Sequence, residues 1–192
     1  YTPWVFHGYD ETFWNRDVMY PVMGFERFVG AEDYNIKEEV GFGITDKEFF
    51  RQSMDYLKEL DELDDNPFYA FMITLTSHTP YEMPMKYQEL TLPSYIEGTY
   101  LGNYLQAIHY TDAAIGEFIE NLKKEGLYKD SVIAIYGDHY GVQVLSEEIN
   151  NLMVKFLGER YWGDTITNVP LILRIPNLEG HHVISDTGSM MD

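Results

Sequence analysis

The sequence contains no cysteine among its 192 residues, which excludes disulfide bonds, thiolate metal ligands and cysteine nucleophiles. It also lacks an apolar run near the roughly 20 residues that a membrane-spanning helix needs, and no signal peptide is visible. Positive charge is scarce, because 13 Lys and Arg stand against 32 Asp and Glu, a formal net charge of −19. Such a field repels phosphate, so nucleic acid is excluded as a general partner, and an anionic substrate needs a local basic pocket.

Apolar and aromatic residues are abundant, at 45% and 16% of the chain, which indicates a folded globular protein. The length suits one well-buried domain, and we expect a single domain over residues 1–192. Because the first residue is Tyr1 and not an initiator methionine, we expect this domain to be a piece of a longer protein.

The most informative stretch is SVIAIYGDHYG, from Ser131 to Gly141. Its uncharged, β-branched run from Val132 to Tyr136 predicts a buried strand, and Asp138 and His139 follow at the carboxyl end of that strand. In open α/β sheets this edge is where ligands bind. A carboxylate and an imidazole there are suited to a divalent cation, but Asp138 could equally cap the next segment while His139 is an ordinary loop residue.

Other apolar segments alternate between strand and helix patterns, which predicts an α/β fold with a mostly parallel sheet flanked by helices. The further predicted strands are Trp4 to Phe6, Phe68 to Thr74 and Val169 to Ile175. The predicted helices run from Thr45 to about Leu60, from Tyr100 to Lys124 and from Glu147 to Leu157. Thr45 and Glu48 have the spacing of a capping box, and residues 23–43 are expected to form a loop with little regular structure.

The helix from Tyr100 to Lys124 has the strongest period in the chain. Its expected buried stripe comprises Leu101, Tyr104, Leu105, Ile108, Ile115, Phe118, Ile119 and Leu122. His109 and Asp112 interrupt the helix and are expected to form hydrogen bonds on its surface. His181 and His182 are adjacent in a loop, where neighbouring side chains point apart, so they are weak evidence for a metal.

His78 follows the strand from Phe68 to Thr74 as His139 follows its own strand. If the two strands are parallel, both histidines face one crevice. The segment from Thr79 to Gly98 contains three prolines and is long enough to act as a lid.

Near the start of the chain, His7, Trp14 and Arg16 lie within ten residues of one another. The Arg guanidinium is a planar donor suited to phosphate or sulfate, and Trp and His can flank the rest of a small polar ligand. The alternative is that Phe13 and Trp14 are core aromatics and Arg16 pairs with a nearby acid.

Three segments together resemble the extracellular catalytic domain of the lipoteichoic acid synthase family, the phosphoglycerol transferases of the sulfatase and alkaline phosphatase superfamily. They are FHGYDETFWNRD, FYAFMITLTSHTPY and YLQAIHYTDAAIGEFIENLKKEGLYKDSVIAIYGDHYG, in the order of the family. The resemblance implies that Asp138 and His139 bind a catalytic Mn²⁺ or Mg²⁺ ion. It also implies that His7, Trp14, Arg16 and His78 hold the phosphoglycerol head group.

In the family, a metal-activated threonine attacks the phosphorus of phosphatidylglycerol, and the phosphoglycerol group then passes to a growing glycerol phosphate polymer. The resemblance thus implies an enzyme anchored in the cell membrane, with its catalytic domain outside the cell and its membrane segments outside this sequence. That threonine and a glutamate ligand lie upstream of the His-Gly motif, and only six residues precede His7 here. No catalytic nucleophile is therefore assigned, and the isolated chain is expected to be inactive.

The sequence departs from the family pattern at two further positions. Tyr9 stands where an acid usually follows His-Gly, and Gln143 replaces a small hydroxyl residue after the Asp-His pair. The sequence also stops at Met191-Asp192, inside the region where the family continues. The alternatives are a sulfatase or phosphodiesterase acting on a soluble ester, and a non-catalytic module that binds the head group.

Overall fold

The computed structural model describes residues 1–63 and 65–189, apart from the side chains of residues 164 and 165. Its first sheet has β1 (Thr2–His7) at the centre, with β2 (Arg27–Val29) on one side and β5 (Phe68–Ile73) on the other. Both neighbours run parallel to β1, and His7 is paired with Ile73 at the carboxyl end. The predicted parallel sheet is confirmed here, with every strand ending at the same edge.

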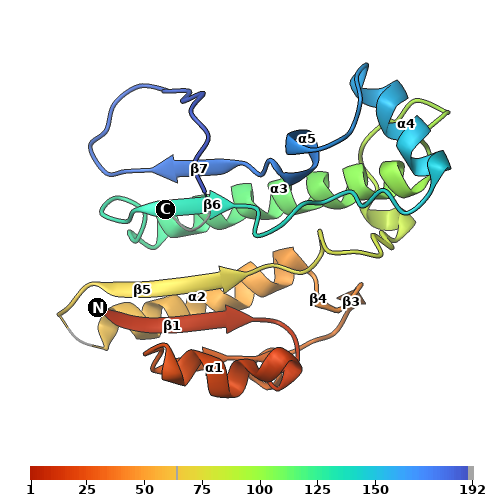
Figure 1. The fold of residues 1–192 in the computed structure, drawn as a ribbon. Helices are drawn as coiled ribbons and strands as arrows, with labels where there is room; N and C mark the ends of the chain where they lie inside the picture. Colours follow the sequence, from red (N-terminus) through yellow and green to blue (C-terminus); the bar gives the residue numbers. More distant parts are fainter. Residues whose placement is uncertain (64, 190–192) are drawn as a thin grey trace.

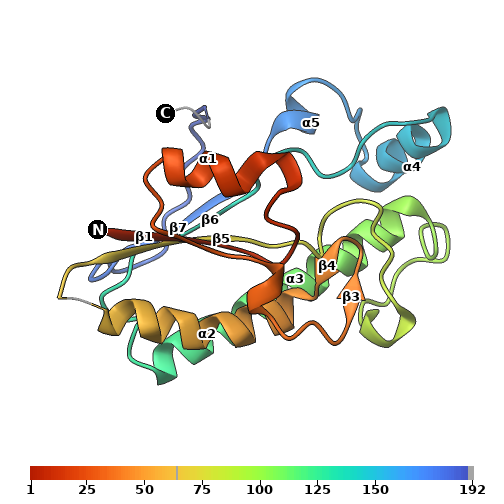
Figure 2. The same ribbon diagram turned by 90° about the horizontal axis from the view of Figure 1, so that it is seen from below.

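Helices cover both faces of this sheet (Figure 2). On one face lies α1 (Arg16–Val22), and on the other lies α2 (Asp46–Glu62), which packs along α3 (Tyr100–Lys124). The main core lies between the sheet and α2, where Phe6, Phe49 and Leu57 are almost completely buried. Both long helices were predicted from apolar spacing.

A second strand pair, β6 (Ile133–Tyr136) and β7 (Leu171–Arg174), is antiparallel. In the described ranges β6 forms no ladder with β5, yet β1, β5 and β6 point the same way (Figure 1). Three strand ends therefore approach one region of the molecule. Beyond β6, α4 (Glu147–Leu157) has the predicted bounds and is followed by α5 (Asp164–Thr167).

The expectation of a loop over residues 23–43 is wrong. This segment contains β2, the short antiparallel pair β3 (Glu39–Val40) and β4 (Gly43–Ile44), and a 3₁₀ turn, Ala31–Asp33. Two further 3₁₀ turns, Phe13–Asn15 and Met85–Tyr87, lie elsewhere. Strands of two or three residues are too short to show an alternating pattern, and β2 forms because β1 offers it a hydrogen-bonding edge.

The buried face of α3 also differs from the expected stripe. Leu101 and Leu122 are buried as predicted, but Ile108 is 40% exposed. The middle of the helix instead buries small and polar residues: Gln106, Ala107, Thr111 and Ala114. A hydrophobic pattern does not detect such a face, because close contact between two helices favours small side chains over large apolar ones.

The capping box predicted at the start of α2 does not form. Thr45 is the N-cap residue, but its side chain makes no cap hydrogen bond and is instead bonded to Tyr110. Glu48 binds the Arg51 guanidinium, at 2.8 Å between Oε2 and Nη2. Within the described ranges, no helix is both long and apolar enough to cross a membrane.

Two glycines of α3 allow a test of how closely the start of this helix packs on the turn before it. A Cβ atom at Gly102 would lie 2.0 Å from the carbonyl oxygen of Ile96, whereas one at Gly116 would have nothing within 4 Å. We expect Gly102→Ala to destabilise the protein by about 1–3 kcal/mol, because a backbone carbonyl cannot move aside. Gly116→Ala should stabilise it by about 0.5–1 kcal/mol, through helix propensity alone. Urea unfolding measures both, and equal effects would contradict this packing.

Candidate active site at the strand ends

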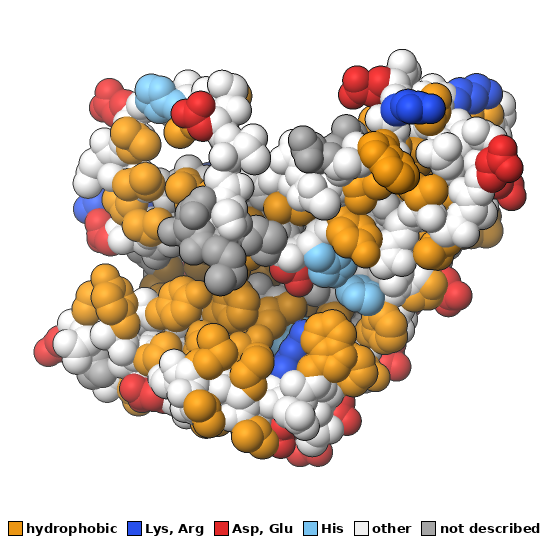
Figure 3. Space-filling view, in the orientation of Figure 1, with side chains coloured by type: hydrophobic (Ala, Val, Ile, Leu, Met, Phe, Trp, Pro, Cys, Tyr) orange, Lys and Arg blue, Asp and Glu red, His pale blue; other side chains and the backbone are white. Residues whose placement is uncertain are grey.

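The structure brings the predicted residues to one region of the molecule, from the carboxyl ends of three strands. His7 ends β1, His78 lies in the turn after β5, and Asp138 and His139 follow β6. The rings of His78 and His139 meet edge to face, with 5.8 Å between centroids. In Figure 3, histidine, acidic and basic side chains gather in the hollow between the two halves of the molecule. Asp138, His139 and His78 thus line one crevice, as the sequence predicted.

His139 is oriented as metal-binding histidines usually are. Its Nδ1 lies 2.7 Å from the carbonyl oxygen of Tyr140, so Nδ1–H donates to that oxygen and Nε2 keeps a free lone pair. Nε2 lies 3.7 Å from Oδ1 of Asp138, and both side chains are largely exposed. These two donors suit a divalent cation. Among the described residues, no group of three or more His, Asp or Glu side chains is placed to hold a metal ion.

His7 is only 2% exposed, and its Nδ1 lies 3.3 Å from the carbonyl oxygen of Ile73. Burial and, to a lesser extent, the positive charge of Arg16 together lower the pKa of His7 from its ordinary 6.5 to about 4. His7 is therefore neutral at pH 7. Its Nδ1–H donates to Ile73, which leaves Nε2 as a hydrogen-bond acceptor.

Arg16 begins α1 and is half-buried, with no salt-bridge partner in the described part of the chain. Its guanidinium carbon lies 5.4 Å from the centroid of the Trp14 ring, within the range of a cation–π contact. Trp14 is 72% exposed, so the alternative of a core aromatic beside an acid-paired arginine is wrong. An unpaired guanidinium in a chain so rich in carboxylates is chemically suited to an anionic ligand.

The backbone before Arg16 adopts a conformation that non-glycine residues seldom take. Trp14 and Asn15 have φ angles of 61° and 54°, in the left-handed region. Such residues cost of order 1–3 kcal/mol each, and they cluster at functional sites. Here they turn the chain sharply between β1 and α1, and place Trp14 beside Arg16.

The sequence prediction missed Asp46, which is completely buried. Its Oδ1 accepts hydrogen bonds from the backbone N–H groups of Leu75 and Thr76, both at 3.0 Å. Its Oδ2 accepts from the Thr111 hydroxyl at 2.6 Å, and its own N–H donates to the Thr76 hydroxyl at 2.9 Å. One carboxylate thus joins the start of α2, the turn that leads to His78, and the middle of α3.

A signal for Asp46 was present in the sequence, but it indicated a different role. An acid in the first turn of a helix normally interacts with the helix dipole and with water. Only the tertiary structure shows that its partners are 29, 30 and 65 residues away along the chain.

The segment from Thr79 to Gly98 does not have the form of a free lid. Tyr81, Met83 and Ile96 are buried, and the Tyr81 hydroxyl donates to the carbonyl oxygen of Gly141 at 2.6 Å. This segment packs beneath the loop that carries His139 and supports it.

The remaining histidines lie outside this cluster. His109 is on the surface of α3, where its Nε2 is 3.9 Å from Oε2 of Glu89, and Asp112 is exposed. Nε2 of His182 lies 3.3 Å from the carbonyl oxygen of Glu179, in the exposed segment where His181 also lies. In the described structure, neither His109 with Asp112 nor His181 with His182 belongs to a group of three or more possible metal ligands.

Comparison with known families gives a match over the whole chain. The family model described as Sulfatase matches residues 1–192. The lipoteichoic acid synthase of Staphylococcus saprophyticus is 40% identical over 185 residues, covering 94% of this chain and 27% of its own length. The lipoteichoic acid synthase-like protein YvgJ of Bacillus subtilis is 38% identical over 196 residues, covering 98% of this chain and 30% of its own length. The chain thus spans less than a third of these relatives.

Solved structures agree on the fold. The lipoteichoic acid synthase LtaP from Listeria monocytogenes superposes with a TM-score of 0.82 at 32% identity, covering 94% of this chain and 44% of that one. Streptococcus pyogenes phosphoglycerol transferase GacH, in complex with sn-glycerol-1-phosphate, gives a TM-score of 0.58 at 19% identity. The match covers 92% of this chain and 45% of GacH, and at this identity it supports the fold alone. The predicted alkaline phosphatase and sulfatase-like α/β fold is confirmed.

The role of Asp46 can be separated from general stability. Asp46→Ala leaves two buried N–H groups unpaired, which should cost roughly 2–5 kcal/mol and displace the His78 turn. In Asp46→Asn, Oδ1 can still accept both bonds while the amide donates to Thr111, so most of the loss should be avoided. Urea unfolding measures stability, and the NMR signals of the His78 ring report the turn.

The matched control is Ser53→Ala, at a position in the same helix as Asp46. It removes a buried hydrogen bond between the hydroxyls of Ser53 and Tyr34. It should lower stability but leave the His78 signals in place. If Asp46→Ala also leaves them unchanged, Asp46 does not position the turn.

The neutral state of His7 predicts a pH dependence of stability. Between pH 6.5 and 4 the unfolded chain binds a proton at His7 that the folded chain does not, so stability falls as the pH is lowered through this window. The contribution is at most about 3 kcal/mol. Urea unfolding at pH 7 and pH 4.5 measures how much of the free energy of unfolding is lost on acidification. We expect this loss to be smaller in His7→Gln than in the unmutated protein. In the control, His109→Gln, it should equal that of the unmutated protein. Identical pH slopes in all three would overturn the assignment.

Proposed function

Because the chain belongs to the sulfatase family, we propose that it forms part of the catalytic domain of a phosphoglycerol transferase. The donor is the head group of a phosphatidylglycerol-type lipid, and the acceptor is a growing glycerol phosphate polymer of the lipoteichoic acid type. The observation that carries the proposal is that Arg16, His7, His78 and the Asp138–His139 pair lie together beside the carboxyl ends of β1, β5 and β6. The similarity to lipoteichoic acid synthases supports it.

The site combines groups for both parts of a phosphoglycerol head group. The Arg16 guanidinium can donate two parallel hydrogen bonds to phosphate oxygens. Nε2 of neutral His7 accepts a hydrogen bond, so it suits a glycerol hydroxyl better than a phosphate oxygen. His78 donates Nδ1–H to the carbonyl oxygen of Thr79, at 2.8 Å, which leaves its Nε2 available to a ligand. The exposed Trp14 ring forms the outer wall.

We assign Asp138 and His139 as two ligands of a Mn²⁺ or Mg²⁺ ion. When bound, such an ion neutralises phosphate charge and lowers the pKa of a coordinated hydroxyl. The Tyr140 carbonyl holds the His139 ring with Nε2 toward Asp138. With only two protein ligands in this set, we expect the isolated chain to bind the ion weakly and to be inactive.

The setting of the whole protein follows from the same proposal. The lipid donor lies in the cell membrane, and the polymer is made outside the cell. We therefore propose a membrane-anchored protein whose catalytic domain is extracellular and whose anchor lies outside this sequence. Hydrolysis of a soluble phosphate or sulfate ester, and head-group binding without catalysis, are the alternatives.

Binding of sn-glycerol 1-phosphate in the presence of Mg²⁺ tests the site. Arg16→Ala should weaken binding about 10- to 100-fold, because it removes charge-assisted hydrogen bonds worth about 1.5–3 kcal/mol. The matched control, Arg160→Ala, removes an exposed arginine of the segment after α4 and should have no effect. His139→Ala should abolish the dependence of binding on Mg²⁺. Calorimetry or NMR measures these constants, and unchanged affinity in Arg16→Ala would exclude the proposed phosphate site.

The alternatives are separated by turnover in the protein that contains this chain. Release of diacylglycerol from phosphatidylglycerol supports the transferase. Hydrolysis of soluble esters alone supports a sulfatase or phosphodiesterase, and binding without any turnover supports a head-group-binding module.

A further inference from the structure

The short hairpin of β3 and β4 lies just beyond the carboxyl ends of β1 and β5 (Figure 1). It packs on Gly8, the residue that follows His7, with no space for a side chain on either partner. A Cβ atom at Gly8 would overlap with Cγ2 of Ile44, and one at Gly43 would lie 2.5 Å from the carbonyl oxygen of Gly8. The hairpin is therefore in direct contact with the end of β1.

The same hairpin also contacts the turn after β5. A Cβ atom at Gly43 would lie 3.0 Å from Cδ1 of Leu75, and the carbonyl oxygen of Leu75 accepts a hydrogen bond from the backbone N–H of His78 at 2.9 Å. The hairpin turn, Gly41 and Phe42, is thus held against two of the strand ends that form the candidate site.

Phe42 differs from the other apolar residues of the hairpin in its exposure. Its side chain is 41% exposed, whereas Val40 and Ile44 are almost completely buried. Its ring meets the ring of His78 at 4.9 Å between centroids, with 75° between the planes. This separation is shorter than the 5.8 Å between the rings of His78 and His139. Phe42 therefore contributes little to the core, and its ring packs closely on a histidine of the site.

The imidazole of His78 has few other contacts that fix its orientation. Its Nδ1–H donates one hydrogen bond, to the carbonyl oxygen of Thr79. Rotation of an imidazole about its last side-chain bond has two broad minima, so one hydrogen bond leaves a turned-over ring accessible. An aromatic ring packed edge to face against the imidazole favours a single geometry and so selects one of the two orientations.

The ring of Phe42 is itself supported by Tyr9. Their centroids lie 6.1 Å apart with 72° between the planes, and Tyr9 in turn meets Phe13 at 5.3 Å and 88°. These rings form a row that runs from the segment before Arg16 to His78. Tyr9 stands where the sequence departs from the family pattern, and its place in this row gives that departure a structural role.

We propose that Phe42 is a positioning residue for His78. Its ring holds the imidazole with Nδ1–H on the Thr79 carbonyl, so that Nε2 is presented to a ligand in one orientation. A preoriented Nε2 strengthens binding, because the ligand does not have to order the ring. The contribution to head-group binding rests on the proposed function, whereas the orientation of the ring does not.

The nitrogen NMR signals of the His78 imidazole test the orientation, because they report which ring nitrogen carries the proton. At about pH 8, where imidazoles are neutral, we expect the proton on Nδ1 in the unmutated protein. Phe42→Leu keeps apolar bulk without a ring, and its signals should move toward a mixture of the two tautomers. Phe42→Tyr retains the ring and should keep the proton on Nδ1. These signals respond to the tautomer far more strongly than to the ring current of a neighbouring side chain.

The affinity for sn-glycerol 1-phosphate in the presence of Mg²⁺ measures the consequence for binding. Phe42→Leu should weaken binding about 3- to 10-fold, which is the range expected from the loss of one aromatic contact. Phe42→Tyr should weaken it by less than about twofold.

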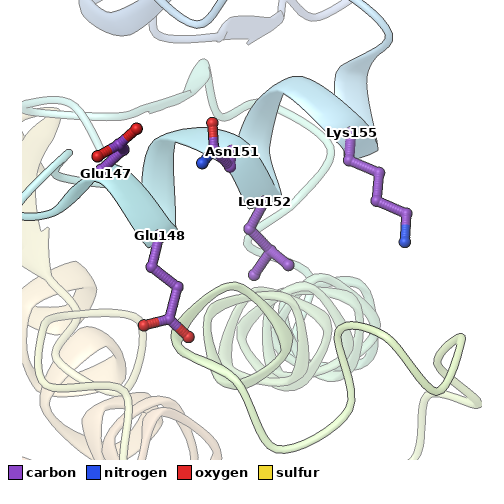
Figure 4. Close-up of a pocket in the computed structure, with 5 residues that line it drawn as sticks. All are labelled: Glu147, Glu148, Asn151, Leu152 and Lys155. Atoms are coloured by element: carbon purple, nitrogen blue, oxygen red, sulfur yellow. The ribbon is translucent and has the colours of Figure 1, made fainter.

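The matched control is Phe156→Leu on α4, because Phe156 is also 41% exposed. It should change neither the His78 signals nor the affinity. One side of α4 borders a surface hollow of about 480 Å³ (Figure 4). The residues that line this hollow lie outside the row of rings: Glu147, Glu148, Asn151, Leu152 and Lys155.

Three results would overturn the proposal: an unchanged tautomer in Phe42→Leu, the same change in Phe156→Leu, or a Phe42→Tyr variant that behaves like Phe42→Leu. A changed tautomer with unchanged affinity would leave the positioning of His78 intact and would count against its role in head-group binding. Failure of this inference is therefore distinct from failure of the proposed function.

Discussion

The buried carboxylate of Asp46 is the interaction on which the arrangement of the site depends. It binds the backbone of the turn after β5 and the Thr111 hydroxyl of α3, while it lies in the first turn of α2. Three segments distant in the sequence are thus held at one point. A buried carboxylate is tolerated only when its oxygens are fully hydrogen bonded, so these segments cannot separate without exposing unpaired polar groups. The position of His78 follows from this constraint.

Around that point, burial and charge give each group a distinct chemistry. His7 is enclosed in the sheet and stays neutral, whereas Arg16 stands half-buried without an acidic partner in a chain of net charge −19. His139 is exposed but oriented by the carbonyl of its neighbour. An acceptor, a fixed cation and a pair of metal-type donors therefore share one crevice. The long-range field of the protein repels anions, so local groups must provide the attraction.

The loop after β6, which carries His139, is held by two tyrosines from distant segments. Tyr81 and Tyr161 hold its backbone through the carbonyls of Gly141 and Val142. The loop that carries His139 is thus anchored at two successive residues.

The sequence by itself determined the class of fold, the long helices α2, α3 and α4, and the strand-end positions of His78, Asp138 and His139. Local periodicity and the run of residues before each motif are sufficient for these features. Only the tertiary structure decided the formation of β2, the small-residue face of α3, the partners of Asp46 and the exposure of Trp14. Each of these depends on contacts between residues far apart in the chain, which local patterns do not record. Burial by such contacts, and not the residue type, is also what makes His7 neutral.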